Sequence, residues 1–185
     1  MREKLLALVC LASLGGCSVT PHPNIQLPDP STSGSPLESS PPTDADNRLT
    51  QVNVARIVDG DTVRVTMPDG SEERVRFIGV DTPERARPFF EEATDYTRST
   101  LAGKSIFLEF DVTQRDRYGR LLAYVWTDSP ASGSEAEIRT KMLNARLLLD
   151  GYAATMTVPP NVRYVELFRV FQQEARQKER GLWAG

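Results

Sequence analysis

The sequence predicts an α+β domain, mainly β, in residues 49–185 of a 185-residue chain. Five short segments carry the alternating apolar pattern of strands, and three longer ones carry the apolar spacing of amphipathic helices. Along the chain the order is three strands, a helix, two strands and two helices. This order predicts a five-stranded Greek-key barrel of the OB-fold type with three helices. An open α+β sheet would produce the same order.

The strands are predicted from their alternation and from the turns between them. The turn Pro68-Asp69-Gly70 separates the second strand from the third. In chain order, the five predicted strands cover about residues 49–57, 62–67, 73–80, 104–112 and 119–127.

The helices are predicted at about residues 87–103, 138–150 and 163–180. Pro88 suits the first turn of the first helix, and glycines end all three, at Gly103, Gly151 and Gly181. The last helix has one apolar stripe, which predicts a core face rather than a binding surface. The stripe consists of Tyr164, Leu167, Phe168, Phe171 and Ala175.

Residues 1–16 have the layout of a lipoprotein signal peptide. Arg2 and Lys4 precede an apolar run from Leu5 to Leu14 that is too short to span a bilayer as a mature helix. The segment LGGC, which ends at Cys17, resembles the lipobox of bacterial lipoproteins, in which cleavage precedes a cysteine that is then lipidated. The alternative is an ordinary cleaved signal that yields a secreted soluble protein.

Residues 17–48 are predicted to be a disordered tether that begins at the lipidated Cys17. The segment is rich in proline and serine and has too few large apolar side chains to form a core. Removal of the signal would also remove Cys10 and leave no cysteine pair, hence no internal disulfide. We therefore expect a monomer on the cell envelope, attached to the membrane through Cys17 and facing outside the cytoplasm.

The charge of the domain does not indicate a polyanion partner. Residues 51–185 contain 19 basic and 20 acidic side chains, so the net charge is −1. Binding to nucleic acid would have to depend on arginines at particular places.

Acidic side chains gather at the end of the predicted hairpin that lies away from its turn: Asp59, Asp61, Asp81 and Glu84. Alternation requires odd-numbered residues to pair with odd-numbered ones. The register that sets Val63 opposite Phe77 places Asp61 diagonal to Asp81, about 7 to 8 Å away. Two carboxylates at that separation suit a hard divalent cation. The alternative is that they are only polar turn and helix-start residues.

Two arginines favour a functional cation site over polar turn residues. Arg76 lies inside the third strand, and Arg120 lies at the entry to the fifth. Together, a cation, carboxylates and arginine side chains can neutralise the charge of a phosphate, activate a water molecule and hold the phosphate in place. These are the requirements of phosphodiester hydrolysis. The one histidine, His22, lies in the tether and takes no part.

Four segments, IVDGDTVRV, VRFIGVDTPE, DRYGRLLAYVW and GLWAG, resemble the successive motifs of the staphylococcal nuclease family. The similarity covers residues 52–183. It implies an OB-fold and a Ca²⁺-dependent phosphodiesterase that cuts single-stranded or double-stranded DNA, or RNA, and leaves 3′-phosphates.

The resemblance also implies roles for individual residues. Asp61 and Asp81 would be carboxylate ligands of Ca²⁺, and Thr82 a ligand through its carbonyl. Glu84 would be the general base. Arg76 and Arg120 would bind the phosphate, with Asp59 behind the metal ligands. The alternation of the strand places Arg76 on the opposite face unless the strand bends, for which Gly79 offers a bulge.

The sequence departs from the family in two places. The loop after Glu84 is shorter than in the best-known member, and Thr157 and Pro159 stand where that enzyme has tyrosines beside the nucleotide. Fewer stacking groups weaken contacts to bases. Arg117 and Tyr118 are candidates for contact with phosphate or sugar, with a solvated loop as the alternative. The competing function is a non-catalytic OB-fold module that binds nucleic acid or another ligand.

Overall fold

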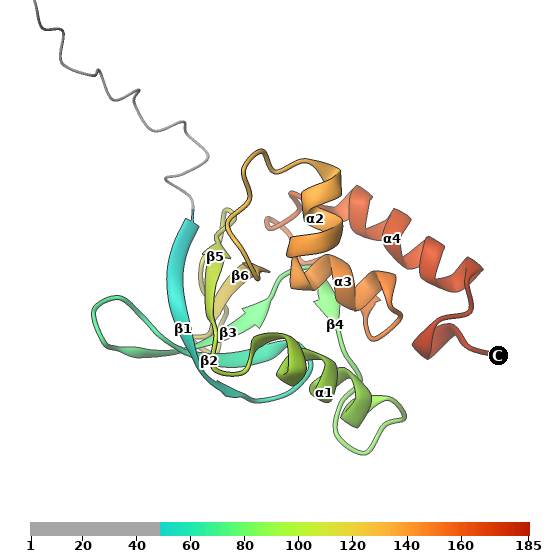
Figure 1. Ribbon diagram of the computed structural model, residues 1–185, viewed down its shortest axis with the longest axis horizontal. Coiled ribbons are helices and arrows are strands. Elements are labelled where there is room, and N and C mark those ends of the chain that lie inside the picture. The colour runs from blue at the N-terminus through green and yellow to red at the C-terminus, as the bar shows by residue number, and fades with distance from the viewer. Residues whose placement is uncertain (1–48) are drawn as a thin grey trace, which may run out of the picture. The chain divides into compact units, whose positions relative to one another are not determined.

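The computed structural model describes residues 49–185 (Figure 1). The predictions for the signal peptide, for Cys17 and for the tether lie outside the described residues. Within residues 49–185, no helix has both the length and the apolar character that a membrane crossing requires.

Five strands close into a barrel in the order β1-β2-β3-β6-β5. All neighbours in it are antiparallel except β3 and β6, which are parallel and close the barrel. The predicted closed barrel is therefore confirmed against the open sheet. The barrel strands are β1 (Leu49–Ile57), β2 (Thr62–Thr66), β3 (Glu72–Phe77), β5 (Ser105–Glu109) and β6 (Leu121–Trp126), and β4 (Val80–Asp81) pairs separately with β7 (Ala154–Thr155).

Four α-helices accompany the barrel in place of the predicted three. In Figure 1, three of them group together beside the barrel and the first lies apart from that group. They are α1 (Phe90–Leu101), α2 (Glu135–Lys141), α3 (Leu143–Leu149) and α4 (Val165–Gln177), followed by a short 3₁₀ turn at Gly181–Trp183.

The helix predicted at residues 138–150 is two helices because the chain becomes extended at Met142. Its ψ is 117°, and it forms a β-bridge with Trp126. The first of the two, α2, also begins earlier than predicted, since the Ser134 hydroxyl accepts a hydrogen bond from the Glu137 amide. Pro88 likewise precedes α1 rather than joining its first turn.

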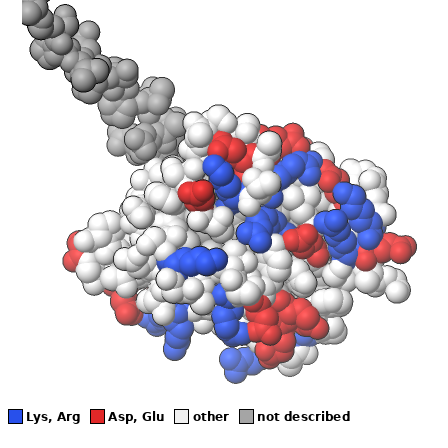
Figure 2. Space-filling view, in the orientation of Figure 1, with Lys and Arg blue, Asp and Glu red and all other residues white. Residues whose placement is uncertain are grey.

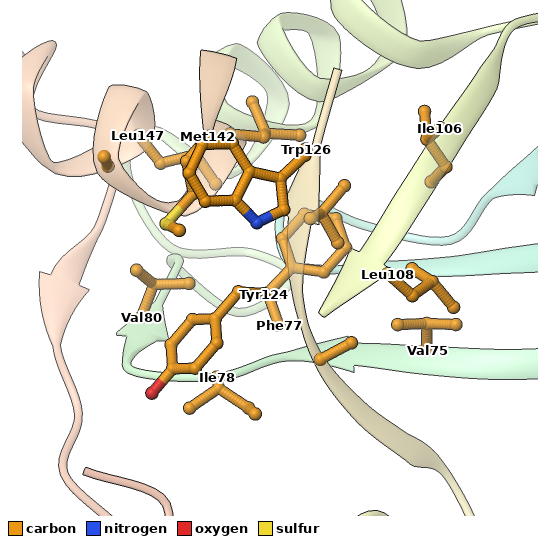
Figure 3. Packing of buried hydrophobic residues seen from close by; sticks show 14 of the residues in the cluster. Val75, Phe77, Ile78, Val80, Ile106, Leu108, Tyr124, Trp126, Met142 and Leu147 are labelled. Carbon is orange, nitrogen blue, oxygen red and sulfur yellow. The ribbon is translucent and has the colours of Figure 1, made fainter. Parts of the chain in front are cut away.

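The predicted core face of α4 is confirmed. Phe168, Phe171 and Ala175 are buried, and Tyr164 and Leu167 are partly buried against the same core. Figure 3 shows Trp126 of β6 beside Met142 and Leu147, so the apolar core continues from the barrel into the helices.

The hairpin of β2 and β3 has the predicted parity but another register. Val63, Val65, Val75 and Phe77 are all buried. Val63 pairs with Val75 rather than with Phe77, a shift of two residues. The cause is the turn: Met67 and Ser71 close it by a 2.8 Å backbone hydrogen bond, and the Asp69 carboxylate accepts from the Ser71 amide at 2.9 Å.

One buried side chain, Asn144 of α3, ties the helices to the barrel. Its carbonyl accepts from the Val125 amide at 2.8 Å, and its amide donates to the Ile78 carbonyl at 2.8 Å. Ile78 lies between β3 and β4, on the way to the acidic end of the hairpin, and Val125 lies in β6, which runs beside β3. In the sequence, Asn144 looks like an ordinary residue of a helix, and nothing there indicated this role.

Asn144→Ala is expected to lower the free energy of unfolding by about 2 to 4 kcal/mol, because two buried backbone groups lose their partners. Chemical denaturation of the full chain measures the change. The exposed Gln173 of α4 gives a control, since Gln173→Ala should change stability by less than about 0.5 kcal/mol. Equal effects of the two substitutions would contradict this role of Asn144.

Candidate active site

The site is built around the carboxylate of Asp61, which is 5% exposed. Its Oδ2 accepts hydrogen bonds from the Thr82 amide at 2.8 Å and from the Thr82 hydroxyl at 3.0 Å. Its Oδ1 lies 3.2 Å from the Thr62 hydroxyl and 3.2 Å from Arg76 Nε. Asp61 therefore fastens the start of β2 to the residues that follow β4.

Arg76 is buried and reaches the acidic side chains. Its Nη1 donates to the carbonyls of Phe77 and Val80, at 2.9 and 2.8 Å, and its Nη2 donates to Asp81 Oδ1 at 2.9 Å. Because Nη1 is held by the backbone, the edge formed by Nε and Nη2 faces the two carboxylates. This edge is the planar fork that arginine presents to a phosphate.

The expected separation of Arg76 from Asp61 is wrong. Asp61 precedes β2, so the alternation of the strand does not fix the direction of its side chain. Its carbonyl pairs with the Phe77 amide at 2.9 Å, which places it opposite Phe77 rather than Gly79. Gly79 is not in a bulge: with φ of 79°, it turns the chain between β3 and β4, so that Val80 and Asp81 return over Arg76.

Gly60 allows the Asp-Gly-Asp turn to pack against Thr82. A Cβ at this position would lie 2.8 Å from the Thr82 side chain. The Gly60 carbonyl accepts a 2.6 Å hydrogen bond from the hydroxyl of Thr97 in α1. The turn that carries Asp59 and Asp61 is therefore held from two sides, by β4 and by α1.

The acidic groups interact unfavourably with one another. Partial burial raises the pKa of Asp81, whose side chain is half exposed, and the charges of Asp61 and Glu84 raise it further, although Arg76 opposes the shift. Burial, followed by the charge of Asp61, also raises the pKa of Asp59, whose Oδ1 accepts from the Asp61 amide at 3.2 Å. The net result is an excess of negative charge at one place.

Glu84 lies in the exposed loop between β4 and α1. Its contribution to the pKa of Asp81 shows that its charge acts on the site. Two non-glycine residues of this loop, Ala86 and Phe89, have positive φ, of 68° and 67°. Such values are uncommon outside glycine and often accompany functional loops.

Arg120 lies near Arg76 because β3 and β6 are parallel neighbours: Arg76 pairs with Leu122, two residues beyond Arg120, and both arginines line one cavity. The Asp116 carboxylate orients Arg120: it accepts from Arg120 Nε at 2.7 Å and from the amides of Arg120 and Tyr118 at 3.0 and 2.9 Å. Sequence reasoning missed Asp116, although an aspartate that opens a loop ending in glycine is a recognisable turn signal.

Arg76 and Arg120 line a cavity of about 480 Å³. Arg117 and Tyr118 line it as well, with the guanidinium of Arg117 4.7 Å from the centre of the Tyr118 ring. Pro159 contributes to the wall, and Thr157 is exposed and is not among the lining residues. The cavity therefore joins a basic end to a wall with aromatic and apolar side chains.

Comparison with known proteins identifies the family. The family model described as staphylococcal nuclease homologue matches residues 74–185. The thermonuclease of Staphylococcus intermedius is 37% identical over 136 residues, which cover 70% of this chain and 74% of that protein. The chain belongs to the staphylococcal nuclease family. The resemblance predicted from the four sequence segments is thereby confirmed.

Other relatives of this nuclease family agree. The thermonuclease of Staphylococcus hyicus is 33% identical over 159 residues, covering 83% of this chain and 86% of that protein. Endonuclease YncB of Bacillus subtilis is 34% identical over 145 residues, covering 74% of this chain and 63% of that protein. The family model includes Arg76, Asp81, Glu84 and Arg120, and Asp61 lies before the span it matches.

The donor groups of the site suit a hard cation. They are carboxylates, with the carbonyl of Thr82 next to Asp81. Burial, and after it the charge of neighbouring carboxylates, raises the pKa of Asp81 and Asp59. Among residues 49–185, no three acidic, histidine or cysteine side chains gather closely enough to hold an ion by themselves. A cation here would depend on Asp61, Asp81 and additional oxygens from the backbone and water.

Asp81→Asn is expected to raise the midpoint of thermal unfolding at pH 7 in the presence of a chelator. A raised pKa means that the folded protein disfavours the charged carboxylate, which the substitution removes. Protonation relieves the same penalty in the unsubstituted protein. The advantage of the variant should therefore shrink as the pH falls toward about 4, near the pKa of an unfolded aspartate.

Asp69→Asn provides the control for this measurement, because hydrogen bonds from Ser71 lower the pKa of Asp69. That variant should show no gain at pH 7. A lower midpoint for Asp81→Asn than for the unsubstituted protein would show that its pairing with Arg76 outweighs the crowding of carboxylates.

Proposed function

We propose that this nuclease-family chain is a Ca²⁺-dependent endonuclease that hydrolyses DNA, RNA or both and leaves 3′-phosphates. The observation that carries the proposal is the position of Arg76, whose Nε and Nη2 edge pairs with Asp61 and Asp81 and which lines one cavity with Arg120. Carboxylates for a cation and arginines for a phosphate thus meet at one end of the barrel.

Asp61, Asp81 and the carbonyl of Thr82 are the groups proposed to hold Ca²⁺. The bound ion would neutralise charge on the phosphate and increase the acidity of a water molecule. If a cation balanced the two carboxylates, the Nε and Nη2 edge of Arg76 would be available to the phosphate oxygens. Arg120, held by Asp116, would bind the same phosphate from the β6 side.

Glu84 is proposed as the group that accepts a proton from the attacking water. Its loop position keeps the carboxylate exposed to solvent and close enough to influence Asp81. The arginines then stabilise the extra negative charge of the transition state, in which the phosphorus has gained the water oxygen. The bond to the 5′ oxygen breaks, this oxygen takes a proton from solvent water to become a hydroxyl, and the phosphate remains on the 3′ side.

The cavity next to the arginines is proposed to hold the nucleotide that flanks the cleaved bond. Tyr118 is an exposed aromatic side chain on its wall, and Pro159 and Val158 supply apolar contact. Few stacking partners imply weak discrimination among bases. This arrangement suits cleavage with little sequence preference.

Glu84→Gln tests the catalytic proposal. In the full chain with Ca²⁺ and single-stranded DNA, the variant should cleave about 10²- to 10⁴-fold more slowly, the usual contribution of a general base. Chelator should abolish cleavage by the unsubstituted protein. End analysis of the products should show 3′-phosphates.

Glu92→Gln is the matched control, since Glu92 is an exposed acidic residue in the first turn of α1. It should retain full activity. If the folded, unsubstituted protein cleaves no nucleic acid at any Ca²⁺ concentration, the alternative of a non-catalytic OB-fold binding module replaces the enzyme.

We also propose that the protein is anchored on the outside of the cytoplasmic compartment by a lipid on Cys17. The support is the LGGC segment and the apolar run before it. In a bacterial host, Cys17→Ser should move the protein from the membrane fraction to the soluble fraction and prevent incorporation of labelled fatty acid. Unchanged fractionation and labelling would contradict a lipid at this residue.

A further inference from the structure

Three arginines form a row across the outer face of the barrel. Arg56 of β1 pairs directly with Arg64 of β2, and Arg64 pairs directly with Arg74 of β3. Arg56 and Arg74 are exposed, and Arg64 is partly exposed. Along β2 and β3, the pair of Arg64 and Arg74 is two residues from the pair of Thr62 and Arg76. The backbones of the two pairs are therefore about 7 Å apart.

The row continues to the proposed phosphate-binding pair. The parallel register that joins Val75 to Leu121 sets Arg74 next to Arg120, which directly precedes β6. Residues Arg120, Arg74, Arg64 and Arg56 therefore follow one another across four adjacent strands. At a spacing of about 4.8 Å between strands, their backbones span about 15 Å.

The structure does little to neutralise this row internally. Like charges that face each other across neighbouring strands are destabilising. Among residues 49–185, Arg64 has one loose ion pair, with Glu72 at 3.9 Å, and Arg56 and Arg74 have none within 4.0 Å. On the face shown in Figure 2, by contrast, basic and acidic side chains are intermingled.

A β-bulge places Arg56 in the row. The register of β1 against β2 shifts between Val54 and Arg56. Val54 faces the core, so regular alternation would also direct Arg56 inward, and the extra residue of the bulge turns it outward. Ala55, Arg56, Arg64 and Glu72 line a shallow hollow at this end of the row.

We propose that the row Arg56, Arg64 and Arg74 binds the sugar-phosphate backbone of a single nucleic-acid strand that continues from the active site past Arg120. The inference rests on the proposed nuclease function and adds its substrate class, strands several nucleotides longer than the cleaved pair. Arginine forks suit phosphate oxygens, and a flexible single strand can follow the curved barrel, as in other sequence-tolerant OB-fold contacts.

The test uses the full chain with Arg56→Gln, Arg64→Gln and Arg74→Gln combined. Fluorescence anisotropy in chelator, which prevents cleavage, measures binding to a 30-nucleotide single-stranded DNA and to a trinucleotide. The variant should bind the long strand about tenfold or more weakly and the trinucleotide unchanged. The slope of log affinity against log salt should become shallower by about 2, the value for three phosphate contacts to a single strand.

The matched control removes the same charge elsewhere, by Arg98→Gln, Arg169→Gln and Lys178→Gln, three exposed residues of α1, of α4 and just after α4. It should leave the long-strand affinity near that of the unsubstituted protein. Because the row variant removes facing like charges, its thermal unfolding midpoint should be equal or higher, so weaker binding would not reflect misfolding.

The outcomes separate this inference from the proposed function. If the unsubstituted protein cleaves DNA with Ca²⁺ but the row variant binds the long strand normally, the role of the row is wrong and the nuclease function stands. If the row variant loses binding to the long strand but the unsubstituted protein does not cleave, the nuclease function is wrong and the binding role of the row stands. Equal weakening by both triple variants would reduce the effect to bulk charge. Binding to anionic phospholipid vesicles is measured as well. If the row variant loses binding to the vesicles but keeps its affinity for the long strand, the row contacts a membrane surface, and the proposal is wrong.

Discussion

The buried guanidinium of Arg76 is the constraint on which the rest of the site depends. Its donors reach two carbonyls at the end of β3 and the start of β4, and two carboxylates that stand before β2 and at the end of β4. A buried charge is costly unless such partners surround it. The turn at Gly79, the packing of Gly60 on Thr82 and the pairing of β4 with β7 all place those partners.

The same groups that stabilise Arg76 leave the site short of positive charge. Asp59 and Asp81 keep a raised pKa even with the arginine present, because burial and neighbouring carboxylates act together. Such an arrangement is expected to reduce the stability of the protein alone, and the proposed cation would relieve the repulsion between the carboxylates. Activity and stability are therefore expected to oppose each other at these positions, as is common in active sites.

Much of the fold and the acidic half of the site could be predicted from alternation, turn residues and spacing. The register could not, because it depends on the closure of the turn at Met67 and Ser71. The break at Met142 depends on a bridge to Trp126, a residue distant in sequence. Arg76 was misplaced because Asp61 lies just outside the strand, where alternation ends. The row of Arg56, Arg64 and Arg74 becomes visible only when the register and the bulge are known.

The parallel pairing of β3 with β6 has a consequence for the time at which the protein becomes active. Arg76 lies in β3 and Arg120 directly before β6, far apart in the chain, and they come close only when this pairing closes the barrel. Contacts between distant segments form slowly, after local structure. An incompletely folded chain therefore lacks the complete phosphate site. For the export proposed here, the cell that makes the protein would carry no active nuclease among its own nucleic acids before the barrel closes.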